Sequence, residues 1–174
     1  MANAAAVIAD AFGRIREDVT SAVVGLDDET LARRPDLGDG PGNSIAWTVW
    51  HLSRVQDDHL AEAFDTDQVW TSGGWAERFA LPFDDAATGY GQSTEEVGQV
   101  RARAEDLIGY HDAVTGRTLQ LLDGLTDDEL ERVLPGTWGD GITLAVRLVS
   151  VIGDDMQHIG QAAYLRGLFG PSGR

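Results

Sequence analysis

The sequence predicts an all-α protein, a four-helix bundle with one long crossover connection. Four long segments repeat apolar residues at three- and four-residue steps, as amphipathic helices do, and almost nothing alternates as a strand does. One long stretch without that period, from Asp65 to Gln92, separates the second segment from the third. Four helices with a single long connection are typical of a bundle in which one link crosses from end to end. We expect residues 1–174 to form one domain, because this length suits a single core.

The first two helices are predicted from their caps and apolar positions. Asn3 is a candidate N-cap for a helix that continues to about Val24. Either Asn43 or Ser44 would cap the second helix, which carries apolar residues at helical spacing as far as about Phe64.

The third and fourth helices have equally clear starts. Ser93 and Glu96 have the spacing of a capping box, and the helix that follows is expected to continue unbroken to about Gly124. The fourth helix is expected to begin around Thr143 and to end at the Gly-Pro pair of residues 170–171.

The crossover stretch is rich in aromatic residues, which argues against a disordered linker. Its tryptophans and phenylalanines are Trp70, Trp75, Phe79 and Phe83. We expect this stretch either to cover a site as a lid or to cross the bundle from one end to the other.

Two short acidic segments resemble each other. Leu26 to Pro35 reads LDDETLARRP, and Leu125 to Pro135 reads LTDDELERVLP. Each precedes a glycine-rich turn and a long apolar helix, so two stacked helical hairpins of common origin would explain the pattern. Acidic residues also commonly begin helices because the N-terminal end of the helix dipole is positive, which leaves coincidence as the alternative.

Composition excludes several classes of function. The chain has no cysteine, so it has no disulfide framework, no cysteine-ligated zinc or iron–sulfur site and no cysteine nucleophile. A net charge of −16 and a pI near 4.3 make nucleic acid and anionic membranes unsuitable partners, because both would repel this surface. No signal peptide and no membrane-spanning stretch are recognisable, so the expected compartment is the cytoplasm.

A candidate metal site follows from three residues. Asp154 and His158 are four residues apart, so they share one face of the fourth helix, where they interrupt an otherwise apolar run. A carboxylate and an imidazole are good ligands for a divalent metal. His51, in the middle of the second helix, would complete the set if the two helices are neighbours. Three protein ligands would leave positions open for water or a substrate thiolate, although a core histidine satisfied by a carboxylate would give the same pattern.

Other histidines and acids are weaker candidates. Asp155, three residues before His158, competes with Asp154 as the ligand. His59 is either a solvated residue at a helix end or an additional group at the site. His111 is more simply interpreted as a partly exposed histidine paired with Asp112 than as a group that reaches the same cavity.

The large and cationic side chains allow further expectations. Trp47 and Trp50 are expected to line the pocket that His51 faces. The side chains that would anchor an anionic substrate, or would instead form surface ion pairs, are Arg54, Arg147 and Arg166.

Two motifs resemble those of the DinB-like metal-binding four-helix bundles. They are SIAWTVWHL at residues 44–52 and D-x-x-x-H-x-G-Q-x-x-Y-x-R-G at residues 154–167. The resemblance is strongest to the actinobacterial branch that holds mycothiol-dependent transferases and the metal-binding domain of mycothiol-dependent maleylpyruvate isomerase. In the wider family a histidine usually precedes His158 by four positions, whereas the mycothiol branch often has an acid, as Asp154 is here. The resemblance implies that His51, Asp154 and His158 bind one divalent metal, commonly zinc or nickel.

The resemblance also implies a function. The metal would activate a low-molecular-weight thiol, expected to be mycothiol, which would attack an electrophile that the sequence does not identify. Two alternatives stay open. One is a metal-dependent hydrolase with Asp155 or His59 as general base, and the other is a non-enzymatic bundle that binds metal for stability or serves as a partner module. Bundles of this kind commonly dimerise, so a homodimer is expected.

Overall fold

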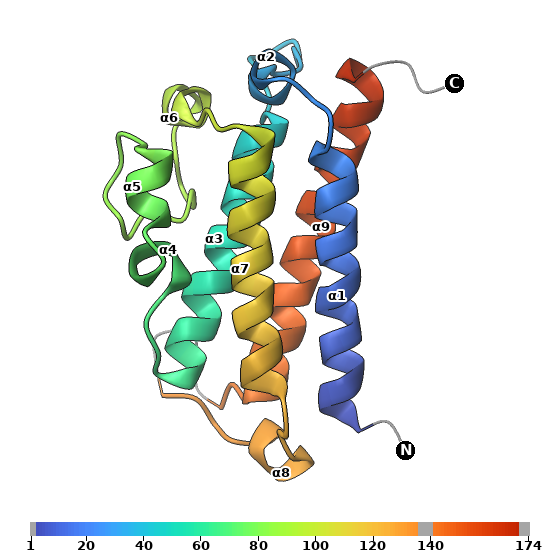
Figure 1. Ribbon diagram of the computed structural model, residues 1–174, viewed down its shortest axis with the longest axis vertical. Helices are drawn as coiled ribbons and strands as arrows, with labels where there is room; N and C mark the ends of the chain where they lie inside the picture. The colour runs from blue at the N-terminus through green and yellow to red at the C-terminus, as the bar shows by residue number, and fades with distance from the viewer. Residues whose placement is uncertain (1–2, 136–140, 171–174) are drawn as a thin grey trace.

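The computed structural model describes residues 3–135 and 141–170, and four long helices dominate this part of the chain (Figure 1). They are α1 (Ala4–Val23), α3 (Ile45–Phe64), α7 (Ala104–Leu122) and α9 (Leu144–Phe169). Each packs against two others, in the cyclic order α1, α7, α3, α9. In Figure 1, α1 and α9 run upward while α3 and α7 run downward, so the neighbours α3 and α9 are antiparallel. The predicted all-α bundle is confirmed.

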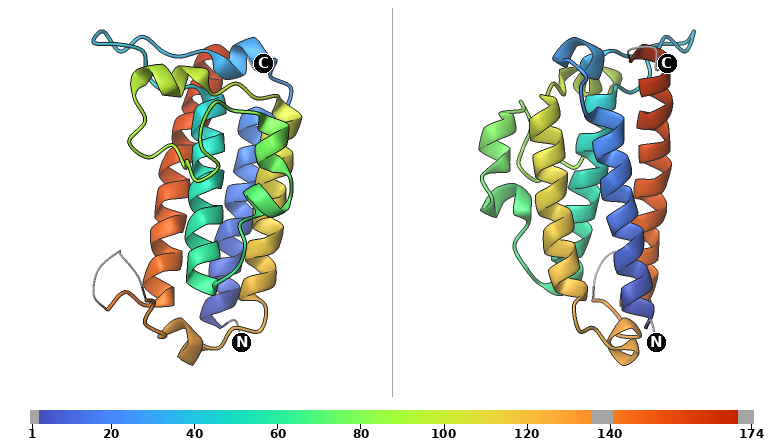
Figure 2. Two further views of the ribbon diagram at one scale, coloured as in Figure 1. Left: turned by 90° about the vertical axis from the view of Figure 1, so that its left-hand side faces the viewer. Right: turned by 45° about the vertical axis from the view of Figure 1, so that its right-hand side comes forward.

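Within the described residues, five short helices cover the ends and one flank of the bundle. They are α2 (Asp28–Ala32), α4 (Val69–Ser72), α5 (Trp75–Phe79), α6 (Thr94–Gln99) and α8 (Asp127–Leu130). Helices α2 and α6 lie at the upper end, α8 at the lower end, and α4 and α5 against the outside of the bundle (Figures 1 and 2). No helix within the described ranges is both long and apolar enough to span a membrane.

The predicted N-caps are observed. The side chain of Asn3 accepts a hydrogen bond from a backbone N–H in the first turn of α1. Thr143, predicted only as the approximate start of the fourth helix, caps α9 in the same way. Ser44, rather than Asn43, caps α3 in this way. At the other end of α9, Gly170 is the C-cap, and Pro171 lies outside the described residues.

The prediction of one unbroken third helix is wrong. The capping box of Ser93 and Glu96 is present, but it begins the short α6, and the backbone is extended at Val100 and Arg103 before α7 starts. The break occurs where the chain reaches the upper end of the bundle (Figure 1). A straight helix would carry Val97 past the ends of its neighbours into solvent, whereas the turn buries both Val97 and Val100.

The crossover runs back along the bundle and is itself folded. It connects the lower end of α3 to the upper end of α7 and forms α4 and α5 on the way (Figure 2). Trp70 and Phe79 are buried against Tyr110 of α7, with ring centroids 5.0 and 5.9 Å from the tyrosine ring. The crossover is therefore anchored by side chains that are part of the hydrophobic core.

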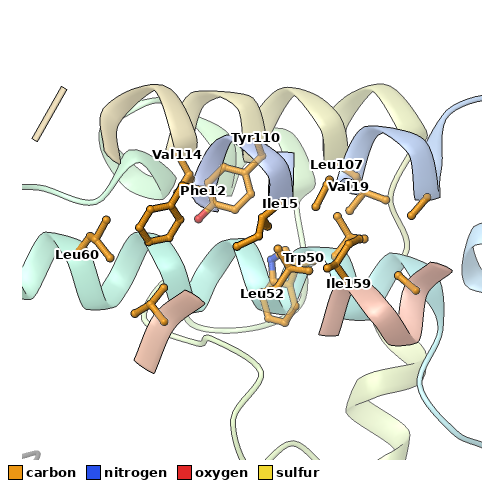
Figure 3. Close-up of a cluster of buried hydrophobic side chains, with 14 of the residues drawn as sticks. Phe12, Ile15, Val19, Trp50, Leu52, Leu60, Leu107, Tyr110, Val114 and Ile159 are labelled. Atoms are coloured by element: carbon orange, nitrogen blue, oxygen red, sulfur yellow. The ribbon is translucent and has the colours of Figure 1, made fainter. Parts of the chain in front are cut away.

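The core lies along the axis of the bundle and draws on all four long helices (Figure 3). Its labelled members are Phe12, Ile15, Val19, Trp50, Leu52, Leu60, Leu107, Tyr110, Val114 and Ile159. Those of α1 and α7 recur at three- and four-residue steps, which is the apolar stripe that the sequence predicts.

The two similar acidic segments have similar structures. They contain α2 and α8, and each is followed by an isolated antiparallel bridge before a Ser- or Thr-capped long helix begins. The bridges pair Asp36 with Pro41 and Val133 with Thr143. The match agrees with two related hairpins, and their common origin stays a prediction.

Candidate metal centre

The antiparallel pair α3 and α9 brings the three predicted ligands together. One ligand atom from each of His51, Asp154 and His158 lies within 4.8 Å of the other two. The centroids of the two imidazole rings are 4.7 Å apart, and the rings are nearly perpendicular. The expectation that the second and fourth long helices are neighbours at these residues is confirmed.

Hydrogen bonds fix which nitrogen of each histidine faces the centre. Nδ1 of His51 donates to the carbonyl oxygen of Thr88, at 2.6 Å. Nδ1 of His158 bonds to Oε1 of Gln161, at 3.1 Å. In each ring the other nitrogen, Nε2, is left as an acceptor, which is the arrangement that metal-binding histidines show.

The charge states also suit a metal. Burial lowers the pKa of His51, partly offset by its bond to Thr88, so this imidazole is neutral at neutral pH. Oδ2 of Asp154 is buried and has no hydrogen-bond partner in the described part of the chain, and Oδ1 lies 3.8 Å from Nε2 of His158. Two lone pairs and a carboxylate thus converge without a proton donor between them, an arrangement that a cation would stabilise.

A cavity of about 360 Å³ opens directly on His51 and Asp154. We call it the metal-site cavity, and its other lining residues are Val55, Asp58, His59, Thr88, Tyr90, Ser150 and Val151. Tyr90 is 92 % exposed, so its ring stands at the mouth of the cavity. The volume suits a small molecule beside the three grouped side chains.

His59 belongs to this cavity but not to the ligand group. The side chain is half-buried, and burial lowers its pKa. Of the two interpretations drawn from the sequence, a solvated helix end is therefore wrong, and a position beside the site is supported.

Asp155 is not a competing ligand. It lies on the face of α9 that also buries Val151 and Ile159, and its carboxyl group is fully buried inside the bundle. Neither of its oxygens has a hydrogen-bond partner among residues 3–135 and 141–170. Burial raises the pKa of Asp155 well above its ordinary value, with the nearby charge of Asp154 adding to the effect.

The interpretation of His111 as a partly exposed partner of Asp112 is wrong. The α7 helix turns His111 into the core, where Nδ1 lies 3.0 Å from Oγ of Ser53 and Nε2 lies 3.3 Å from Oγ1 of Thr115. Complete burial lowers its pKa to about 4, so the ring is neutral. Asp112 pairs with Arg16 instead.

None of the three arginines proposed as anion anchors lines the metal-site cavity. Arg54 is fully buried and donates to the crossover, Arg147 pairs with Glu62, and Arg166 donates to backbone carbonyls at the end of α1. These guanidinium groups bond to the protein itself, so an anion anchor at the metal-site cavity is not supported. Arg166 lines another cavity, beside α1, and an anion anchor there stays a prediction.

The two tryptophans of α3 have different surroundings. Trp47 stacks on His51 with ring centroids 4.6 Å apart, and its Nε1 donates to Gln92. Trp50 is buried under the crossover against Trp70 and Phe83. Neither tryptophan is among the residues that line the metal-site cavity, so the expectation that both line it is wrong. Trp47 lies beside the two imidazole rings instead.

Sequence reasoning missed the groups that orient the two histidines. Thr88 acts through its backbone carbonyl oxygen, which any residue type could supply, so the sequence carries no signal for it. Gln161 acts through its side chain, and its sequence signal is its place in the motif at residues 154–167. Gly89 could have been suspected, because it stands in a Thr-Gly-Tyr-Gly turn after the aromatic stretch. It has φ +94°, and a Cβ there would lie 2.7 Å from Nδ1 of His51.

Comparison with known proteins identifies a matching family model and a solved structure with a similar fold. Residues 11–162 match the family model described as the DinB superfamily. A solved structure, described as "Crystal structure of the conserved protein of locus from Enterococcus faecalis", superposes with a TM-score of 0.85. The two chains are 27% identical, and the match covers 97% of this chain and 98% of the other. No curated protein matches.

Proposed function

This chain belongs to the DinB superfamily, and from that membership and the geometry of His51, Asp154 and His158 we propose that it is a divalent-metal-dependent transferase of a low-molecular-weight thiol. Members of the superfamily typically bind a metal. The observation that carries the proposal is the convergence of two imidazole rings and a carboxylate, with no proton donor among them, beside a cavity that His51 and Asp154 line. Zinc or nickel as the metal and mycothiol as the thiol are the finer parts of the proposal, and they rest on the two sequence motifs.

A divalent cation held there would lower the pKa of a thiol that enters the cavity, so that the sulfur is a nucleophile at neutral pH. The protein's own residues prepare that step. The Thr88 carbonyl and the Gln161 carboxamide hold the two imidazole rings with Nε2 inward. His59, neutral because burial lowers its pKa, lines the same cavity and can accept the proton that the thiol loses at a ring nitrogen.

The charges around the cavity favour a thiol without carboxylates. Its described lining includes the acids Asp58 and Asp154 and no arginine. A carboxylate on the part of the thiol that lies away from the metal would therefore meet the charge of Asp58 with no arginine in the described lining, whereas a hydroxyl group there would find hydrogen-bonding groups such as Ser150 and Tyr90.

The first test is the metal content of the purified protein. We expect about one equivalent of zinc or nickel in the wild type and its loss in His158→Ala, because two ligands hold a divalent ion poorly. Gln157→Ala is the matched control, since Gln157 is the exposed neighbour of His158 and its side chain donates to the carbonyl oxygen of Gly153, within its own helix turn. A wild-type protein that takes up no metal after reconstitution would overturn the proposal.

The second test separates thiol transfer from the other functions. In protein reconstituted with Co²⁺, we expect 2-mercaptoethanol to change the visible spectrum of the metal, and the change to be absent in His158→Ala. A metal that binds with no response to any thiol would rule out transfer. Hydrolysis of model esters by that protein would then favour a hydrolase, and loss of folding with the metal would favour a stabilising ion.

A further inference from the structure

A second cavity, larger than the metal-site cavity, lies further along the same pair of helices. Its volume is about 650 Å³, within the usual range for small-molecule sites. One wall comes from the chain that leads into α3, and the other from the last turns of α9. We call it the Tyr164 cavity, and its apolar lining residues are Pro35, Leu37, Tyr164, Leu165 and Leu168.

Apolar side chains on this surface are unusually exposed. Leu37 is 66 % exposed, Tyr164 is 72 % exposed and Leu168 is 54 % exposed, and all three line the one cavity. Single exposed apolar residues are ordinary on a protein surface, but a group of them around a concave site with a polar rim marks a place where a ligand binds.

The polar groups of the Tyr164 cavity select a neutral ligand. Three amide side chains line it, those of Asn43, Gln157 and Gln161, and they can donate to or accept from a carbonyl or hydroxyl group. Among its described lining residues Asp36 alone is charged, and this carboxylate already accepts a hydrogen bond from the backbone N–H of Gly38. With no cation in the lining, an anionic ligand would be repelled rather than bound.

One residue connects this cavity to the metal centre. Gln161 lines the Tyr164 cavity, and its Oε1 also bonds Nδ1 of His158. A ligand that bonds to the carboxamide of Gln161 changes the hydrogen bond that orients His158, and such outer partners affect metal affinity.

We propose that the Tyr164 cavity binds a neutral, mainly apolar small molecule, and that Gln161 transmits its presence to His158. The cavity part of this inference does not rest on thiol transfer. By linkage, a ligand that alters the affinity for the metal must have its own affinity altered by the metal to the same extent.

Binding is tested with the neutral fluorophore N-phenyl-1-naphthylamine. We expect saturable binding to one site, weakened about tenfold or more by Leu168→Asp, because the substitution places a carboxylate against an apolar ligand. Val149→Asp is the control and should change the affinity less than about twofold, because Val149 is 61 % exposed on the same helix and lines neither cavity. Binding that does not saturate, or that both variants weaken equally, overturns the proposal.

The coupling is tested by measuring zinc affinity, with a competing chelator, in the absence and presence of the same fluorophore. We expect roughly a fivefold or greater change in the wild type. In Gln161→Met the change should disappear while the fluorophore still binds. Zinc affinity that is equal with and without the fluorophore in the wild type refutes the link. A protein that binds the fluorophore but no zinc would overturn the proposed metal function and leave the cavity itself supported.

Discussion

The backbone of Gly89 lies so close to the His51 ring that a side chain at position 89 would displace the ring. A Cβ at position 89 would be 2.7 Å from Nδ1 of His51, and the φ of +94° is one that L-residues rarely adopt. The close approach lets the neighbouring Thr88 carbonyl accept the His51 hydrogen bond. Gly91, two residues on, shares the positive φ but has open space around it.

This pair allows a controlled substitution. Both Gly89→Ala and Gly91→Ala should destabilise the protein by about 1–2 kcal/mol, since each forces an alanine into the left-handed region. Only Gly89→Ala should also weaken metal binding, by about 10–100-fold, because it displaces the partner of His51. Urea denaturation and chelator competition measure the two effects. Equal metal affinity in the two variants would contradict the role given to Thr88.

Asp155 makes the stability of the metal-free protein depend on pH. Burial raises its pKa in the folded state above the ordinary 3.8, so the folded protein retains a proton that the unfolded chain loses. Stability should therefore fall as pH rises from about the ordinary pKa toward the raised one, and Asp155→Asn should remove this part of the dependence. Urea denaturation of chelator-treated protein over that range is the measurement, and coincident profiles of the two proteins would disprove the assignment.

Replacing the same carboxyl group with an apolar one should stabilise the fold. Asp155→Leu removes a buried carboxyl group that lacks a partner in the described part of the chain, and we expect a gain of about 1–3 kcal/mol at neutral pH. The metal content should be unchanged, because Asp155 is not in the ligand group. Loss of metal together with stability would indicate that the carboxyl group contributes to the centre.

At the scale of elements, the crossover is attached to α3 by a buried polar network. Arg54 donates to the carbonyl oxygens of Asp85 and Ala87, at 3.0 and 3.1 Å, and to the side chain of Gln68. Asp57 accepts from two N–H groups at the start of α4 and from the hydroxyl of Tyr110. The residues that precede Thr88 are thereby held against α3, one turn from His51.

Arg54→Lys tests this attachment. The lysine keeps a positive charge near Asp57 but has fewer donors, so buried carbonyl groups lose their partners, and we expect a loss of about 1–3 kcal/mol in stability. Amide hydrogen exchange should accelerate in residues 84–92 more than in α1. Arg16→Lys is the control, because Arg16 forms an exposed surface pair with Asp112, and it should cost less than about 1 kcal/mol. Uniform acceleration across the bundle would contradict a local role for Arg54.

At the scale of the whole molecule, the metal centre joins two helices that are far apart in sequence. His51 comes from α3, while Asp154 and His158 come from α9, so the site exists only when the bundle is assembled. Metal binding and folding are therefore linked, because the unfolded chain has no comparable site.

Zinc should accordingly stabilise the whole protein. At a free concentration of one hundred times the dissociation constant we expect about 2.7 kcal/mol of added stability in the wild type. His158→Ala should show little of this gain, and Gln157→Ala should retain it. Thermal unfolding with and without zinc is the measurement, and equal stabilisation of wild type and His158→Ala would place the metal elsewhere.

The sequence by itself determined the parts of this protein that depend on neighbours along the chain. Caps such as Ser44, Ser93 and Thr143 act within one turn of backbone, so their positions could be predicted. The spacing of Asp154 and His158 likewise places both on one helical face without knowledge of anything else.

The tertiary structure decided everything that depends on which way a helix faces and where its neighbours end. It turned Asp155 and His111 into the core, used Arg54 to hold the crossover, and broke the third helix at Val100. It also set the Thr88 carbonyl against His51. A side chain is buried or paired according to groups brought from distant parts of the chain, and these contacts form only as the apolar stripes of the four helices pack together.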